Sequence, residues 1–85
     1  VDAAVATAFA LAVTHPAAGN IGGGGYLWLA PARGEPIVFD FREVAPATAT
    51  PEMFVKPEGR TPHCRVGVPG TVRGLALAHT RLVAH

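Results

Sequence analysis

Residues 1–14 form an apolar stretch that is rich in alanine and contains neither glycine nor proline. Alanine and leucine favour helices, so this stretch predicts a helix. Polar side chains interrupt it only at Asp2, Thr7 and Thr14, so we expect a helix that is apolar on almost every side and therefore buried. Asp2 lies where a carboxylate caps a helix or complements its dipole. With 14 residues the stretch is shorter than the roughly 20 that span a bilayer, which favours a core helix.

Two strand patterns follow a glycine-rich crossing. Residues 26–30 are mostly large and apolar, and residues 37–42 alternate between apolar and polar positions near their end. The connection between them, residues 31–36, has the composition of a turn, so the pair predicts a hairpin. Because side chains alternate across a strand, Phe39 is expected to face a core and Arg42 the opposite side.

Arg42 is the candidate functional residue, since it stands where the second strand ends and a loop begins. Binding residues are common on loops that a rigid scaffold positions. The alternative is a structural ion pair with Asp40, two residues back on the same face, or with the adjacent Glu43. Most such pairs near a surface contribute little to stability.

The remainder of the chain predicts a loop and a second helix. Prolines break residues 44–62, leaving room for one short helical turn at residues 52–55. Thr71 is placed to cap a final helix over residues 72 to about 84. Its apolar stripe is expected to contain Val72, Leu75, His79, Leu82 and Val83. The order of helix, strand hairpin, loop and helix indicates an α+β fold.

Composition indicates a slice from the interior of a larger protein. Hydrophobic residues make up 49% and charged residues only 15%, against about 25% charged in an average soluble domain. A net charge of +1 gives no electrostatic case for nucleic acid or for contact with an anionic membrane. The single cysteine, Cys64, has no partner for an internal disulfide, and no ligand spacing indicates a zinc or other metal site.

The glycine run at residues 22–25 has two interpretations. Consecutive glycines suit an anion-binding loop, but a phosphate loop follows a strand, opens a helix and ends in Gly-Lys-Ser/Thr. This run instead precedes a strand, which favours a start where backbones pack too closely for a Cβ atom. The four histidines are scattered and the chain contains no serine, so we expect no catalytic residue for acyl transfer within it.

Several phrases, in order and at matching spacing, resemble the amino-terminal part of γ-glutamyltranspeptidases. They cover nearly the whole chain, and the segment RTPHCR at residues 60–65 departs from the family's pattern. The matching phrases are VDAAVA at residues 1–6, THP at 14–16, GNIGGGG at 19–25, DFREVAP at 40–46, MF at 53–54 and GVPGTV at 67–72.

The resemblance implies a fragment of a four-layer αββα N-terminal-nucleophile hydrolase sandwich. Residues 1–85 would be an internal slice of the large subunit, made in a precursor that cleaves itself. The partner would be the small subunit, which carries the catalytic threonine, so no catalytic residue is expected in this chain. The family location implies a periplasmic or secreted protein, and no cofactor is implied.

Arg42 maps onto the family's arginine that binds the α-carboxylate of the γ-glutamyl group, with Asp40 and Glu43 expected to orient its guanidinium. The implied reaction is transfer or hydrolysis of γ-glutamyl amides such as glutathione. There are two alternatives. The first is a related acylase that acts on glutaryl or cephalosporin substrates, and the second is a non-catalytic structural module of the same fold.

Overall fold

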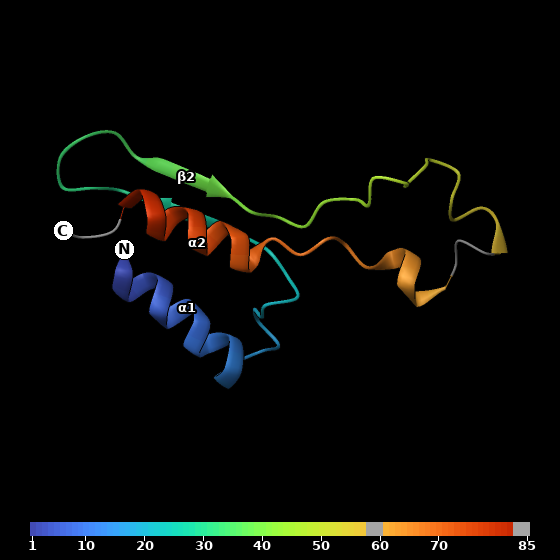
Figure 1. The fold of residues 1–85 in the computed structure, drawn as a ribbon, viewed down its shortest axis with the longest axis horizontal. Helices are drawn as coiled ribbons and strands as arrows, with labels where there is room; N and C mark the ends of the chain where they lie inside the picture. Colours follow the sequence, from blue (N-terminus) through green and yellow to red (C-terminus); the bar gives the residue numbers. More distant parts are fainter. Residues whose placement is uncertain (58–60, 83–85) are drawn as a thin grey trace.

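The computed structural model describes residues 1–57 and 61–82 and confirms the predicted order of elements (Figure 1). Within these residues, two α-helices and one 3₁₀ helix accompany an antiparallel two-stranded hairpin. No helix in the described part of the chain has the length and apolarity that a membrane span requires. The elements are α1 (Asp2–Thr14), β1 (Tyr26–Leu29), β2 (Ile37–Asp40), the 3₁₀ helix η2 (Pro62–Arg65) and α2 (Thr71–Leu82).

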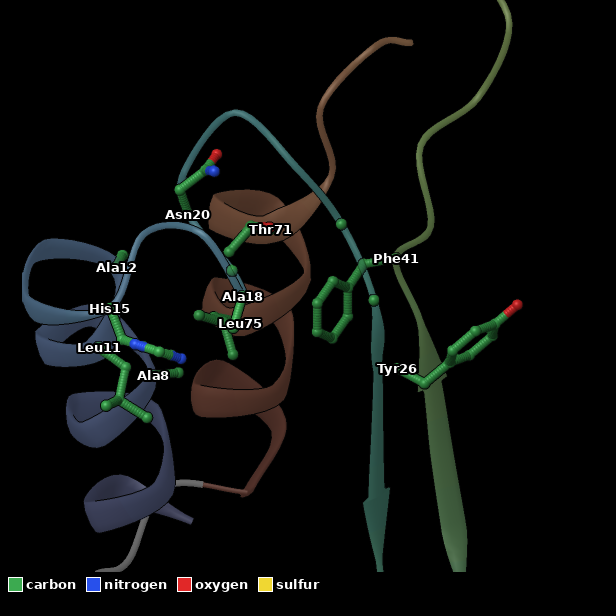
Figure 2. A pocket seen from close by; sticks show the side chains of 13 residues that line it. Ala8, Leu11, Ala12, His15, Ala18, Asn20, Tyr26, Phe41, Thr71 and Leu75 are labelled. Atoms are coloured by element: carbon green, nitrogen blue, oxygen red, sulfur yellow. The ribbon is translucent and has the colours of Figure 1, made fainter.

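The hairpin has the predicted face alternation. Leu27 pairs with Phe39, and Trp28 pairs with Val38. Phe39 is 6% exposed whereas Trp28 is 68% exposed, so only one face of the hairpin is covered within this chain. That covered face lies against α2, and α1 lies on the other side of α2 (Figures 1 and 2).

Strand β2 is shorter than predicted, ending at Asp40 rather than Arg42. Backbone pairing continues for one more residue, because Gly25 and Phe41 exchange two hydrogen bonds of 2.9 and 3.3 Å. The regular pairing stops where the Arg42 amide donates to the Asp40 carboxylate instead, at 3.1 Å. A side chain that binds the backbone two residues on forms an Asx turn, which competes with a strand ladder.

Helix α1 forms where predicted, but it is covered on one side only. Val5 is its one buried residue, while Leu11 and Val13 are 49% and 81% exposed. The expectation of burial on every side is therefore wrong for this chain by itself, because α2 is the one described element that packs against α1. Asp2 makes no capping hydrogen bond and instead pairs with His79 of α2, at 3.5 Å.

Helix α2 buries a stripe that matches the predicted one only in part, since Leu75 belongs to both. Gly74, Leu75 and Ala78 are buried, whereas Val72 and His79 are exposed. The small side chains let the helix approach the hairpin closely, so size rather than hydrophobicity selects the contact face. Thr71 is the first helical residue, and the expected continuation through residues 83 and 84 lies outside the described residues.

An extended arm separates the hairpin from α2. Residues 45–57 lead away from the body and residues 61–67 return to it (Figure 1). Val44 and Val68 close its base through two backbone hydrogen bonds of 3.3 and 2.8 Å. A turn forms over the predicted residues 52–55, but η2 forms in a stretch that was expected to be loop. Pro62 at the start of η2 has a fixed φ that suits the first helical position.

Candidate functional site

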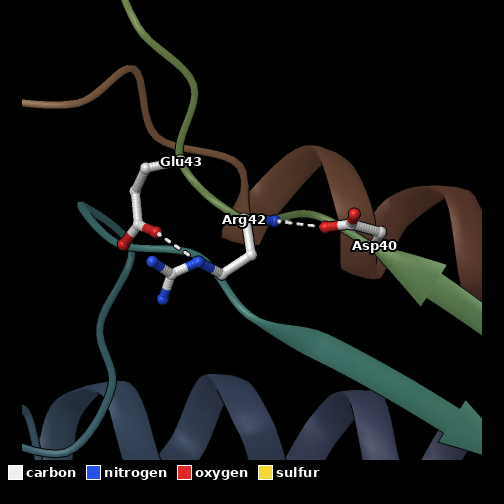
Figure 3. A network of polar contacts seen from close by, with 3 residues as sticks. All are labelled: Asp40, Arg42 and Glu43. Atoms are coloured by element: carbon white, nitrogen blue, oxygen red, sulfur yellow. Dashed lines mark hydrogen bonds and ion pairs between the residues drawn. The ribbon is translucent and has the colours of Figure 1, made fainter.

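Arg42 lies two residues beyond the end of β2 at Asp40, and its side chain is 62% exposed. Its Nε atom is 3.7 Å from Oε2 of Glu43, while the Asp40 carboxylate accepts from its backbone amide (Figure 3). The two expected carboxylates therefore have different roles. Glu43 contacts the guanidinium, and Asp40 fixes the backbone from which the side chain extends.

The ion pair between Arg42 and Glu43 involves one nitrogen of the guanidinium, as the dashed line in Figure 3 shows. An exposed pair of this kind contributes roughly 0–1 kcal/mol, so stability is a weak reason for it. The terminal nitrogens on the other side of the fork carry the pair of parallel donors that suits a carboxylate. The terminal nitrogens of Arg42 are therefore able to bind an anionic group while Glu43 contacts the Nε atom.

Glycines from two separate segments bring the backbone around Arg42 into place. A Cβ atom on Gly24 would lie 2.8 Å from the Glu43 nitrogen and 3.0 Å from the Arg42 carbonyl carbon. A Cβ atom on Gly70 or on Gly74, at the start of α2, would overlap atoms of Phe41. Side chains at these positions would force the segments apart, and the strand end that carries Arg42 would move with them.

The glycine run is a structural crossing, as its position before a strand predicted. The Gly22 amide donates to the Asn20 side chain at 2.8 Å, and the Gly23 amide donates to the Asn20 carbonyl at 3.2 Å. The Gly23 carbonyl in turn accepts from Gly70 and Thr71, at 2.9 and 3.1 Å. These backbone groups hold the crossing to the start of α2 and are occupied within the chain, which disfavours the anion-loop interpretation.

Sequence reasoning missed the parts played by Gly70 and Gly74. A glycine inside a helix costs about 1 kcal/mol relative to alanine. The position of Gly74 inside the predicted helix could therefore have indicated a close packing contact there. Its partner, the Phe41 ring, was not identifiable from local sequence.

Two hollows flank Phe41. One, of about 270 Å³, lies between α1, α2 and the glycine crossing, with Leu11 and His15 on one side and Leu75 on the other (Figure 2). The second, of about 290 Å³, lies between the end of β2 and the start of α2 and is lined by Arg42 and Arg73. Both hollows are mostly apolar, but the lining of the second includes two guanidinium groups, those of Arg42 and Arg73, together with the Asp40 carboxylate.

Among the residues that the structure describes, the remaining polar candidates do not assemble into a reactive site. His15 borders the apolar hollow, His63 lies in η2, and His79 pairs with Asp2. Cys64 lies 3.2 Å from the Thr61 hydroxyl. No group of three or more His, Cys, Asp or Glu side chains within residues 1–57 and 61–82 is placed to hold a metal ion.

The sequence that forms this α+β arrangement, with Arg42 two residues beyond β2, matches one known protein family. Residues 1–83 match the sequence profile of the family described as gamma-glutamyltranspeptidase. The chain is therefore a member of the gamma-glutamyltranspeptidase family.

Known proteins match the chain over most of its length. It is 51% identical over 85 residues to the glutathione hydrolase proenzyme of Escherichia coli (strain K12), covering 92% of this chain and 15% of that protein. A gamma-glutamyltranspeptidase from Pseudomonas nitroreducens, solved as a complex with L-DON, is 50% identical with a TM-score of 0.79, covering 95% of this chain and 26% of that one. The Helicobacter pylori gamma-glutamyltranspeptidase is 47% identical with a TM-score of 0.84, covering 94% and 25%.

Proposed function

We propose that the protein containing this chain transfers or hydrolyses γ-glutamyl groups, with glutathione as a substrate. Membership of the family and the glutathione hydrolase names of its relatives support this class of activity. The observation that carries the role of this segment is the exposed fork of Arg42, held by Glu43 on one side. Arg42 binds the α-carboxylate of the γ-glutamyl group.

The chain spans 15% of the E. coli relative, so most of the catalytic machinery belongs to other parts of the protein. We place residues 1–85 in the large subunit of a four-layer αββα sandwich. The word proenzyme in the relatives' names supports a precursor that is cleaved, and the small subunit is then the partner of this segment. The exposed outer face of the hairpin, with Trp28 68% and Val38 59% exposed, is available for further layers.

In the proposed reaction, a threonine hydroxyl of the small subunit attacks the γ-carbonyl carbon of the substrate. The C–N amide bond breaks, the hydroxyl proton passes to the leaving amine, and a γ-glutamyl ester forms on the threonine. Water or an amino acid then takes the acyl group and restores the hydroxyl. Arg42 forms no bond in these steps, but its two parallel donors fix the far end of the acyl group so that the carbonyl is held for attack.

Arg42→Ala in the full-length, processed enzyme tests this role. Loss of a charge-assisted pair with a desolvated substrate group costs about 2–5 kcal/mol, so KM for γ-glutamyl substrates should rise at least tens-fold. Arg42→Lys should restore binding only partly, because lysine lacks the planar fork. Steady-state kinetics on both variants, with self-cleavage checked on a gel, provide the measurement.

Substrate preference separates γ-glutamyl transfer from the related acylase activity. A glutaryl amide lacks the α-amino and α-carboxylate groups, so Arg42→Ala should reduce the preference for γ-glutamyl over glutaryl amides. A processed variant with unchanged KM and an unchanged ratio would show that Arg42 does not bind the carboxylate. A full-length protein without any acyl-transfer activity would instead support the non-catalytic module.

A further inference from the structure

The Glu43 side chain lies against two glycines from distant parts of the chain, Gly23 and Gly67. A Cβ atom added to Gly67 would lie 2.8 Å from the Glu43 Cβ and 3.5 Å from its Cγ. On the carboxylate side, a Cβ atom added to Gly23 would lie 3.4 Å from Oε1 of Glu43. The distance from Gly23 is an ordinary van der Waals contact, whereas the distance from Gly67 is a clash, so the position of the Glu43 Cβ depends on the absence of a side chain at residue 67.

The Glu43 side chain connects Gly67 to the Arg42 guanidinium. The Glu43 side chain is 31% exposed, half as much as that of Arg42 at 62%, so Glu43 is the more enclosed member of the pair. Its Oε2 contacts Nε of Arg42, the nitrogen on the inner edge of the fork. A displacement of Glu43 at its Cβ would shift this contact and turn the outer nitrogens away from their position.

We propose that Gly67 is a positioning residue for binding of the substrate carboxylate, acting through Glu43 on Arg42. This inference rests on the proposed role of Arg42. Gly67 belongs to the returning part of the arm and directly precedes Val68, whose two hydrogen bonds with Val44 close the base of the arm. The arm thereby contributes Gly67 to the site, although its outer part lies away from the helices and the hairpin (Figure 1).

A purely conformational need for glycine does not account for Gly67. Among the described glycines, only Gly34 has a positive φ, of 102°. A side chain at position 67 is therefore compatible with the local backbone, and its clash is with Glu43. A substitution at Gly67 should therefore change substrate binding at Arg42 and leave the local backbone conformation unchanged.

The test is Gly67→Val in the full-length enzyme, with Gly67→Ala as a milder change if the valine variant does not fold. Misplacing a group that binds the substrate equally in the ground state and in the transition state raises KM and leaves kcat almost unchanged. We expect KM for a γ-glutamyl anilide to rise about tenfold in Gly67→Val and about threefold in Gly67→Ala, with kcat within about twofold. Gly19→Val is the matched control, because a Cβ atom there meets nothing within 4 Å.

A double-variant cycle identifies the route of the effect. If Gly67 acts through Arg42, then Gly67→Val should raise KM in the native background and leave it unchanged in an Arg42→Ala background. Additive effects, or a normal KM in both Gly67 variants while Arg42→Ala raises KM, would overturn the role of Gly67 and leave the proposed function standing. A normal KM in Arg42→Ala would overturn both.

Discussion

Two irregular regions of the chain differ in how closely they are packed. One is the junction, where Gly24, Gly70 and Gly74 meet Phe41, and the other is the arm beyond Val44. At the junction, Gly24, Gly70 and Gly74 let backbone segments approach Phe41 and Arg42 closely. In the arm, Phe54, Val55 and Val66 are 48%, 71% and 60% exposed, respectively. The first region is close-packed, whereas the second presents apolar side chains that this chain does not cover.

The difference shows what glycine and proline each contribute to the site. Glycine at the junction removes side-chain bulk, so amides such as those of Gly70 and Thr71 reach the Gly23 carbonyl. Proline in the arm withholds an amide and fixes φ, which prevents regular pairing over residues 46–57. Arg42 and Glu43 lie at the boundary, where close packing ends and the arm begins.

The largest expected effect comes from filling the junction. Gly24→Val in the full-length protein would place side-chain atoms against the backbone of Arg42 and Glu43, where even a Cβ atom comes within 2.8 Å. Because backbone atoms have little room to move, we expect loss of soluble, self-cleaved enzyme. The ratio of precursor to subunits on a gel measures this.

Gly19→Val is the control for that change as well, since it adds the same side chain to open space in the same crossing. It should be processed normally. Equal processing of the two variants would show that the junction tolerates bulk and is no more closely packed than the arm.

A smaller effect is expected from truncating leucines on α2. Leu75 is 3% exposed and lies towards the junction, whereas Leu77, on the same helix, is 45% exposed. Leu75→Ala should destabilise the protein by about 2–5 kcal/mol, and Leu77→Ala by less than about 1 kcal/mol. Thermal or denaturant unfolding of the full-length protein compares the two. If Leu77→Ala were the more destabilising change, other parts of the protein would cover Leu77, and α2 would be packed on both sides.

The smallest effect is expected in the arm. Val55→Ala removes two methyl groups from a side chain that is 71% exposed, so stability should change by no more than about 0.5 kcal/mol. The same unfolding measurement applies. A loss of 2 kcal/mol or more, within the range for buried truncations, would show that the arm is buried in the whole protein and would remove the contrast with the junction.

Local sequence patterns predicted most of the elements. The alternation in β2 predicted that Phe39 faces inward, as observed, whereas the strand ends two residues before Arg42 and not at it. The stripe on α2 was predicted less well, since hydrophobicity favoured Val72 and the structure buries Gly74 and Ala78 instead. Periodicity identifies the apolar face of a helix, but it does not show how closely a neighbouring element approaches that face.

Sequence by itself determined the helix over residues 2–14, the hairpin and the family, because helix propensity, strand alternation and motif order are properties of neighbouring residues. The tertiary structure decided which carboxylate holds the Arg42 guanidinium and which one holds its backbone. It also decided that Gly67, 24 positions after Glu43, lies against that side chain. Such contacts depend on how the arm returns to the body, and no local pattern specifies the distance between segments so far apart in the chain.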